Sequence, residues 1–283
     1  MISKIGLGTV QWGLEYGISN TNGIPTDAEL DAIVRLATQN DIDLFDTASQ
    51  YGNAEARLGN YITKNSSVVS KFSPVNHSSF ENEIQGSLER LNVEQLYGYL
   101  FHAPKDLINN PLLWDQMQNL KVKKKVKKIG YSLYSPEELE LFLDKNWIPD
   151  IVQLPYSLLD RKFEPYFEQL KSLGTEIHIR SVFLQGLYFK STETLSPAFN
   201  DLKNALKELK EIATEFSLTT VELALNFVLK NEYVDYTVIG VEQSNQLKEI
   251  ISASKIDFPK SIKERVNALS IENPTLLNPS NWK

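Results

Sequence analysis

Short apolar runs alternate with longer amphipathic segments along the whole chain. The apolar runs predict eight strands, at residues 4–9, 42–46, 68–71, 97–102, 128–132, 151–154, 176–181 and 236–239. Strands that alternate with segments of helical periodicity are typical of βαβ units, in which neighbouring strands run parallel. The pattern therefore predicts an α/β fold built on a parallel sheet.

The amphipathic segments predict helices at residues 26–39, 80–91, 136–143, 163–173 and 217–229. Thr26 precedes the first of them as an N-cap with Glu29 at the third helical position, and Ser135 followed by Pro136 starts another. Eight strand and helix pairs with right-handed crossovers close into a barrel. We predict a (β/α)8 TIM barrel that forms a single domain over residues 1–283, with its active site at the C-terminal end of the strands.

An open doubly wound sheet is the alternative for the same alternation of elements. Such a sheet normally carries a Gly-rich phosphate turn directly after its first strand. Residues 6–8 read Gly-Leu-Gly, but residues 9–11 read Thr-Val-Gln, so the third glycine of that motif is missing. The sequence therefore favours the barrel.

Composition narrows the partners and the compartment. The chain has 283 residues, of which 42% are hydrophobic, and a formal net charge of -7, which opposes binding to nucleic acid or to an anionic membrane. It contains no Cys, which excludes disulfides and thiol nucleophiles. There is no apolar run long enough for a signal peptide or a membrane helix. We expect a cytoplasmic enzyme that is a monomer or a small homo-oligomer.

Three of the predicted strands end in titratable side chains. Asp46, Lys71 and His102 close the second, third and fourth strands, and Tyr51 lies on the loop after the second. Barrel enzymes keep their catalytic groups at this end of the strands. A phenol has an ordinary pKa of about 10, and a nearby ammonium group lowers it. We therefore expect Lys71 to lower the pKa of Tyr51, and Asp46 to hold Lys71 charged and oriented.

These groups make a general acid that can protonate a carbonyl oxygen while a hydride reaches the carbonyl carbon. His102 would bind the substrate oxygen or share the proton of Tyr51. Because a protein has no hydride donor of its own, the chemistry implies a nicotinamide cofactor. The expected partner is a small-molecule carbonyl substrate.

Each of these residues also has a structural interpretation. Asp46 can cap a strand end, Tyr51 can belong to an ordinary turn, and His102 can be a core residue. Trp12 and Tyr16 follow the first strand and are candidates for an apolar wall around the substrate, with core packing as the alternative.

Several short motifs occur together in a fixed order. They are GLGT at residues 6–9, FDTA at 45–48, YG at 51–52, GYS at 130–132, VQ at 152–153, QGL at 185–187 and VIG at 238–240, with Lys71 and His102 between them. In these motifs and their spacing the chain resembles the aldo-keto reductase superfamily. The resemblance implies a (β/α)8 barrel that binds NAD(P)H without a Rossmann fold, with Asp46, Tyr51, Lys71 and His102 as its catalytic tetrad.

The resemblance also implies a cofactor site, in which Ser132 and Gln153 contact the nicotinamide carboxamide. The full set of implied cofactor-binding residues is Gly8, Thr9, Ser132, Gln153, Arg180, Ser181, Phe183, Gly186, Gly240, Glu242, Gln246 and Glu249. Many members stack an aromatic ring on the nicotinamide where this chain has Arg180, whose planar guanidinium can stack instead. No metal is implied.

Two cofactors remain open on this interpretation. Members that prefer NADP(H) usually place Lys or Arg near the 2'-phosphate, where this chain offers Gly240, Glu242 and Gln246. A carboxylate at Glu242 repels a phosphate and can accept from a ribose 2'-hydroxyl, as acids do in other NAD(H) sites. The family as a whole favours NADP(H), and the local residues favour NAD(H).

The sequence thus predicts an oxidoreductase that interconverts an aldehyde or ketone and an alcohol, with Tyr51 as general acid and base. A sugar or sugar derivative is one candidate substrate. The alternative is a nucleotide-binding regulatory subunit with the same barrel and little turnover, as in the potassium-channel β-subunits of the family. A metal-dependent barrel hydrolase or isomerase would need a cluster of His, Asp and Glu ligands that the strand ends lack.

Overall fold

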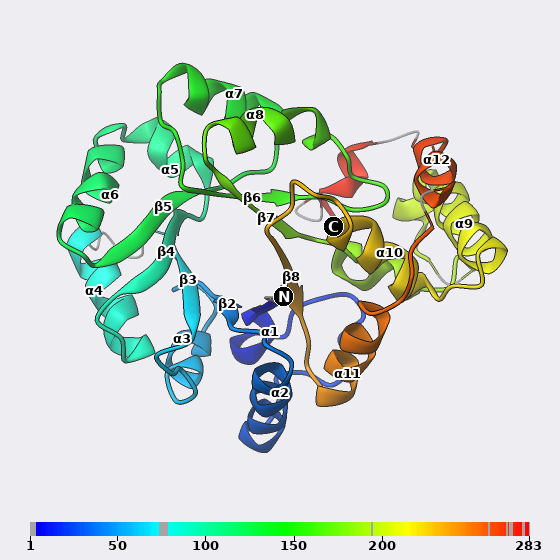
Figure 1. Ribbon diagram of the computed structural model, residues 1–283, viewed down its shortest axis with the longest axis horizontal. Coiled ribbons are helices and arrows are strands. Elements are labelled where there is room, and N and C mark those ends of the chain that lie inside the picture. The colour runs from blue at the N-terminus through cyan, green and yellow to red at the C-terminus, as the bar shows by residue number, and fades with distance from the viewer. Residues whose placement is uncertain are drawn as a thin grey trace.

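Eight parallel strands close into a barrel in the computed structural model, which describes residues 4–73, 79–193, 195–259, 261–269, 271, 274–278 and 281–282 (Figure 1). The strands are β1 (Ile5–Gly8), β2 (Leu44–Asp46), β3 (Ser67–Phe72), β4 (Leu96–Phe101), β5 (Val126–Ser132), β6 (Ile151–Pro155), β7 (Glu176–Arg180) and β8 (Tyr236–Gly240). β8 pairs with β1, so the sheet is a closed ring and not an open doubly wound sheet. The predicted (β/α)8 barrel is confirmed.

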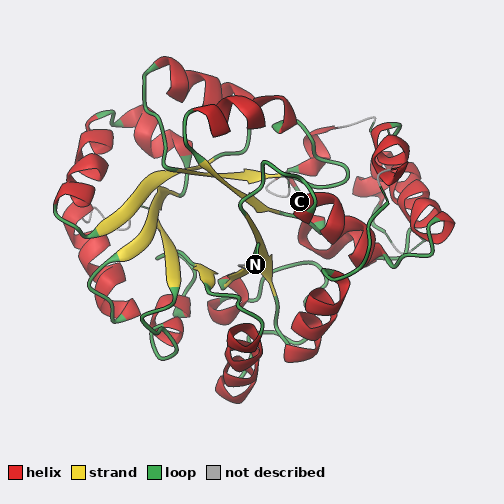
Figure 2. Ribbon diagram, in the orientation of Figure 1, coloured by secondary structure: helices red, strands yellow, loops and turns green. Residues whose placement is uncertain are grey.

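Helices surround the strands on the outside of the barrel (Figure 2). They are α1 (Val10–Gly13), α2 (Asp27–Gln39), α3 (Ala54–Leu58), α4 (Phe80–Leu91), α5 (Pro104–Asn109), α6 (Leu112–Val122), α7 (Pro136–Asp144), α8 (Phe167–Ser172), α9 (Asn200–Glu215), α10 (Thr220–Leu229), α11 (Ser244–Ala253) and α12 (Ser261–Asn267). Short 3-10 turns lie at Glu164–Tyr166, Leu184–Phe189, Pro197–Phe199 and Pro274–Leu277.

The helix starts follow local capping. The Thr26 hydroxyl accepts from the Glu29 amide at the start of α2, as predicted. The helix predicted from residue 217 begins later, because Thr219 and Glu222 form a capping box at the start of α10. Ser217 has a φ of +54°, which is outside the helical region.

Within the described ranges, no single helix has the length and apolar character needed to cross a membrane. Pro197–Glu215 and Thr220–Leu229 together have the length and composition of a membrane span, but the two parts are bent by 91° relative to each other.

The parallel register brings the carboxyl ends of the strands to one rim. Gly8, the last residue of β1, pairs with Asp46 on one side and with Gly240 on the other. Ser132 and Arg180 are likewise the last residues of β5 and β7. Residues that are far apart in sequence therefore surround one space at this end of the barrel.

The opposite end of the barrel holds a cluster of charged side chains. Tyr97 on β4 donates to both Glu176 carboxylate oxygens at 2.9 Å, and the Lys128 ammonium contacts the same carboxylate. His178 Nε2 lies 3.4 Å from Glu176 Oε2. Burial opposes ionisation, but the hydrogen bonds from His178 and Lys128 outweigh it and lower the pKa of Glu176 to about 2.

Candidate active site

A buried ion pair lies at the carboxyl ends of β2 and β3. Lys71 Nζ donates to Asp46 Oδ1 at 2.5 Å and to the Thr47 carbonyl oxygen at 3.1 Å. Gln153 Nε2 donates to the second Asp46 oxygen at 2.7 Å. Lys71 is 1% exposed and Asp46 is 4% exposed. Because charges buried this deeply must be paired, these contacts fix both side chains in place.

Tyr51 and His102 lie against each other beside this ion pair. Their ring centroids are 5.6 Å apart with the planes at 83°, an edge-to-face contact. The Lys71 ammonium lies 5.3 Å from the centroid of the Tyr51 ring. The structure therefore brings together all four residues of the predicted tetrad.

Two glycines hold the loop that carries Tyr51. Gly52 has a φ of +58°, and a Cβ at this position would lie 2.4 Å from the Gly13 carbonyl oxygen. A Cβ on Gly13 would lie 1.9 Å from the carbonyl oxygen of Tyr51. Only residues without side chains allow this close backbone contact, which sets the position of Tyr51 against α1.

Tyr51 keeps its proton in this environment. Burial, followed by the negative charge of Asp46, raises the pKa of Tyr51 above its ordinary value. The expectation that Lys71 would lower this pKa was wrong, because burial and the charge of Asp46 outweigh any effect of Lys71. A phenol that stays protonated is suited to donating a proton.

His102 is neutral at physiological pH. Burial and then the charge of Lys71 lower its pKa to about 4. Its Nδ1 is buried and has no hydrogen-bond partner among the described residues. A neutral imidazole offers one donor and one acceptor, so it can bind a polar ligand atom at this position.

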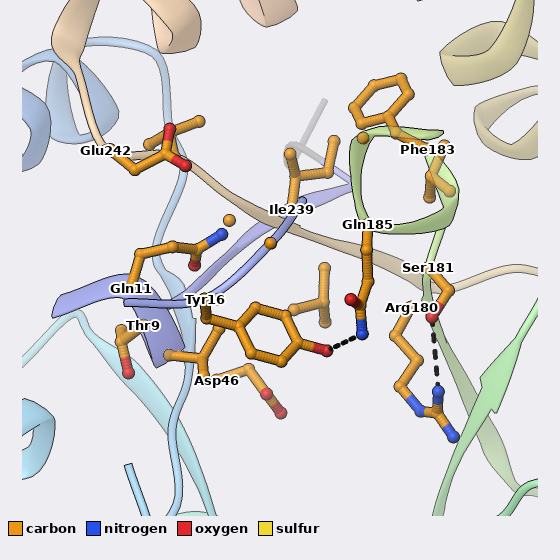
Figure 3. Close-up of a pocket in the computed structure, with 18 of the residues that line it drawn as sticks. Thr9, Gln11, Tyr16, Asp46, Arg180, Ser181, Phe183, Gln185, Ile239 and Glu242 are labelled. Atoms are coloured by element: carbon orange, nitrogen blue, oxygen red, sulfur yellow. Dashed lines mark hydrogen bonds between the residues drawn. The ribbon is translucent and has the colours of Figure 1, made fainter. Parts of the chain in front are cut away.

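A cavity of about 730 Å³ opens beside these groups (Figure 3). Asp46, Tyr51 and His102 line it, whereas Lys71 lies behind Asp46 and does not reach it. Every residue of the predicted cofactor site lines the cavity: Gly8, Thr9, Ser132, Gln153, Arg180, Ser181, Phe183, Gly186, Gly240, Glu242, Gln246 and Glu249.

The two predicted substrate residues have different positions. Tyr16 lines the cavity, and its hydroxyl accepts from Gln185 Nε2 at 2.6 Å (Figure 3). Trp12 is completely buried and packs edge-on against Phe45 with centroids 6.4 Å apart. The prediction that Trp12 forms a substrate wall was wrong, because α1 directs this ring into the core.

The sequence did not indicate five polar residues that line the cavity, Gln11, Ser19, Gln50, Tyr134 and Gln185. Gln11 fills the space left by Gly240, where a Cβ would lie 2.3 Å from Gln11 Oε1. The only sequence signal was the position of Gln11 close after the end of the first strand. Gln185 belongs to the QGL motif but was not assigned a contact.

The cavity walls fit a polar ligand. Thr9 Oγ1, Gln11 Oε1 and His102 Nδ1 all belong to lining residues, and all three atoms are buried without a partner in the described part of the chain. Buried polar atoms are nearly always hydrogen-bonded, so a ligand with several donors and acceptors satisfies them. These residues therefore fit the nicotinamide cofactor that the sequence implies.

The N-terminus of α11 already has protein acceptors. The Glu242 and Gln243 amides donate to Gln246 Oε1 at 2.8 and 3.1 Å. The Ser244 amide donates to Glu29 Oε1 at 2.5 Å, and this bond lowers the pKa of Glu29. A helix N-terminus is normally free to bind a phosphate. Here a carboxylate from α2 occupies part of that position.

The described residues contain no group of three or more His, Asp or Glu side chains placed to hold a metal ion. The prediction that the site needs no metal remains a prediction.

Comparison with known proteins identifies the family. The model of the Aldo/keto reductase family matches residues 4–271. Pyridoxal reductase of Arabidopsis thaliana chloroplasts is 27% identical over 81% of this chain and 73% of its own length. The aldo-keto reductase YhdN of Bacillus subtilis is 26% identical, over 88% of this chain and 84% of its own.

A solved structure agrees in fold. The holo form of an aldo-keto reductase from Bacillus halodurans superposes with a TM-score of 0.75 at 19% identity, covering 94% of this chain and 91% of the other. Since the family model covers nearly the whole sequence, the chain belongs to the aldo/keto reductase family.

Proposed function

We propose that this chain, within the NAD(P)H-dependent carbonyl chemistry of its family, reduces a small aldehyde or ketone with Tyr51 as the proton donor. The observation that carries the proposal is the contact between Tyr51 and neutral His102 at the wall of the cavity, 5.6 Å between ring centroids. Both are groups that a carbonyl oxygen can meet from the cavity.

The residues divide the chemistry between them. When bound, the nicotinamide supplies hydride to the carbonyl carbon. Tyr51 holds its proton until the oxygen gains negative charge and then donates it, which completes the alcohol. His102, which is neutral, orients the oxygen through a ring nitrogen. Asp46 and Lys71 are positioning residues that fix the wall behind the phenol.

The substrate class is tested with purified protein, a panel of aldehydes and ketones, and both cofactors. Pyridoxal belongs in the panel because a relative is named as pyridoxal reductase. Open-chain sugar aldehydes belong there because polar side chains such as Ser132 and Gln153 are part of the cavity lining. The expected result is saturable consumption of reduced cofactor with at least one carbonyl. Saturable cofactor binding with no turnover on the whole panel would instead support the regulatory subunit.

We also propose that NAD(H) is preferred to NADP(H). Glu242 is 7% exposed in the cavity wall next to the N-terminus of α11. Glu29 accepts the hydrogen bond of the Ser244 amide at this N-terminus. Lys248 on α11 does not line the cavity, and its Nζ lies 3.5 Å from Asn245 Oδ1. Two carboxylates disfavour a 2'-phosphate, whereas a ribose hydroxyl can donate to Glu242.

A further inference from the structure

We infer that Arg180 binds a carboxylate on the substrate, so that the chain acts on carbonyl compounds that carry a negative charge. This inference rests on the proposed reductase function. It concerns a position where the chain departs from the aromatic residue common in its family.

Uncharged groups hold the Arg180 guanidinium in position. Its Nη2 donates to the Leu133 carbonyl oxygen at 2.8 Å, and its Nη1 donates to Ser181 Oγ at 3.3 Å. The guanidinium carbon lies 4.0 Å from the centroid of the Tyr134 ring, which covers one face. Arginine has five N–H donors, so further donors remain for an acceptor in the cavity.

No acidic side chain neutralises this cation. Across the described residues, no carboxylate lies within ion-pair distance of Arg180, whereas Arg57 and Arg90 pair with Asp27 and Glu55 at 2.7 Å. Asp160, whose carboxylate is influenced by the Arg180 charge, pairs with Lys162 at 2.6 Å. A half-buried cation without a counter-ion costs free energy, which an anionic ligand recovers.

The charge lies on the catalytic side of the cavity. Arg180 is the one Lys or Arg among the described residues that line the cavity. Its positive charge acts on both Tyr51 and His102, although burial has the larger effect on the pKa of each. Asp46 and Lys71 form an ion pair that carries no formal net charge, although Asp46 affects the pKa of Tyr51 more than Arg180 does. With Arg180, this side of the cavity has a positive formal charge.

Apart from Asp46, which is paired with Lys71, the acidic residues that line the cavity lie elsewhere. Glu242 and Arg180 are on opposite sides of the close-up view (Figure 3). Glu249 is on α11, beyond Glu242. A carboxylate is repelled from that side and attracted to Arg180, which places the carbonyl of the same small molecule near Tyr51 and His102.

The test compares two aldehydes of the same shape that differ in charge, 4-formylbenzoate and 4-formylbenzamide. In Arg180→Gln, we expect KM for 4-formylbenzoate to rise at least about tenfold, because a charge-assisted bidentate contact is lost. KM for 4-formylbenzamide should rise much less, and any loss of NADH affinity, measured by fluorescence, should affect both aldehydes equally. Arg35→Gln removes an exposed arginine of α2 and is the matched control.

Calorimetry separates this inference from the reductase function, because it needs no turnover. 4-Formylbenzoate is titrated into wild type and Arg180→Gln, each alone and with NAD. Weaker binding in the variant supports the inference even if no aldehyde is reduced. Equal KM changes for both aldehydes, or a matching loss of NADH affinity, would overturn it and assign Arg180 to the cofactor. Equal binding of 4-formylbenzoate to wild type and variant would also overturn it.

Discussion

Lys71 and Asp46 form an ion pair with a distance of 2.5 Å between Nζ and Oδ1, and both side chains are almost completely buried. The pair lies behind the cavity wall and also receives the Gln153 amide. Its effect on stability can be separated from its effect on catalysis, since Lys71 does not line the cavity.

Asp46→Asn should destabilise the fold by about 3–5 kcal/mol, because it leaves the Lys71 ammonium buried without a counter-ion. Urea unfolding measures the change. Asp27→Asn removes the exposed partner of Arg57 and should cost less than about 1 kcal/mol. The double variant Asp46→Asn with Lys71→Met should recover much of the loss. If Asp46→Asn costs no more than Asp27→Asn, the pair does not stabilise the fold.

Tyr51→Phe should lower turnover by about 10²- to 10⁴-fold, because it removes the proton donor and keeps the ring contact with His102. Fluorescence titration should show unchanged cofactor affinity. Tyr16→Phe removes another phenol that lines the cavity, one bonded to Gln185, and is the control. A Tyr51→Phe enzyme with nearly full turnover, or a similar loss in Tyr16→Phe, contradicts the assignment of Tyr51.

Glu242→Gln should improve NADPH binding relative to NADH by about tenfold, or ~1.4 kcal/mol, because a buried negative charge near the proposed phosphate position is removed. Direct titration of the protein with each cofactor measures this without turnover. Glu208→Gln on the exposed face of α9 makes the same change in net charge and should alter neither affinity. An unchanged affinity ratio in Glu242→Gln would remove Glu242 from cofactor selection.

Glu176 should make the stability of the barrel depend on acid pH. Its pKa is lowered to about 2 in the folded protein, from its ordinary value of 4.5. Between these values the unfolded chain binds more protons, so the stability contributed by Glu176 is complete above about pH 4.5 and is lost as the pH falls toward 2. Urea unfolding from pH 5 to about 2.5 measures the slope.

Glu176→Gln should flatten this slope, because glutamine does not titrate. Glu208→Gln, which changes an exposed residue, should keep the wild-type slope. The same slope in wild type and Glu176→Gln would show that another group causes the loss of stability at acid pH.

Much of the barrel could be predicted because its signals are local. The apolar run that ends at Asp46 and the capping residues before α2 and α7 each lie within a few positions of the element they determine. Once the strands are parallel and closed, their last residues must share one rim. The positions of Asp46, His102 and Arg180 around a common cavity therefore followed from the sequence.

The direction of side chains and the balance of charges depended on the tertiary structure. Trp12 points into the core because of how α1 packs, and the pKa of Tyr51 depends on burial and on Asp46. The Glu29 carboxylate meets the Ser244 amide from 215 positions away in the chain. Local sequence determines where an element begins and ends, but pKa values and ligand contacts depend on neighbours that only folding brings together.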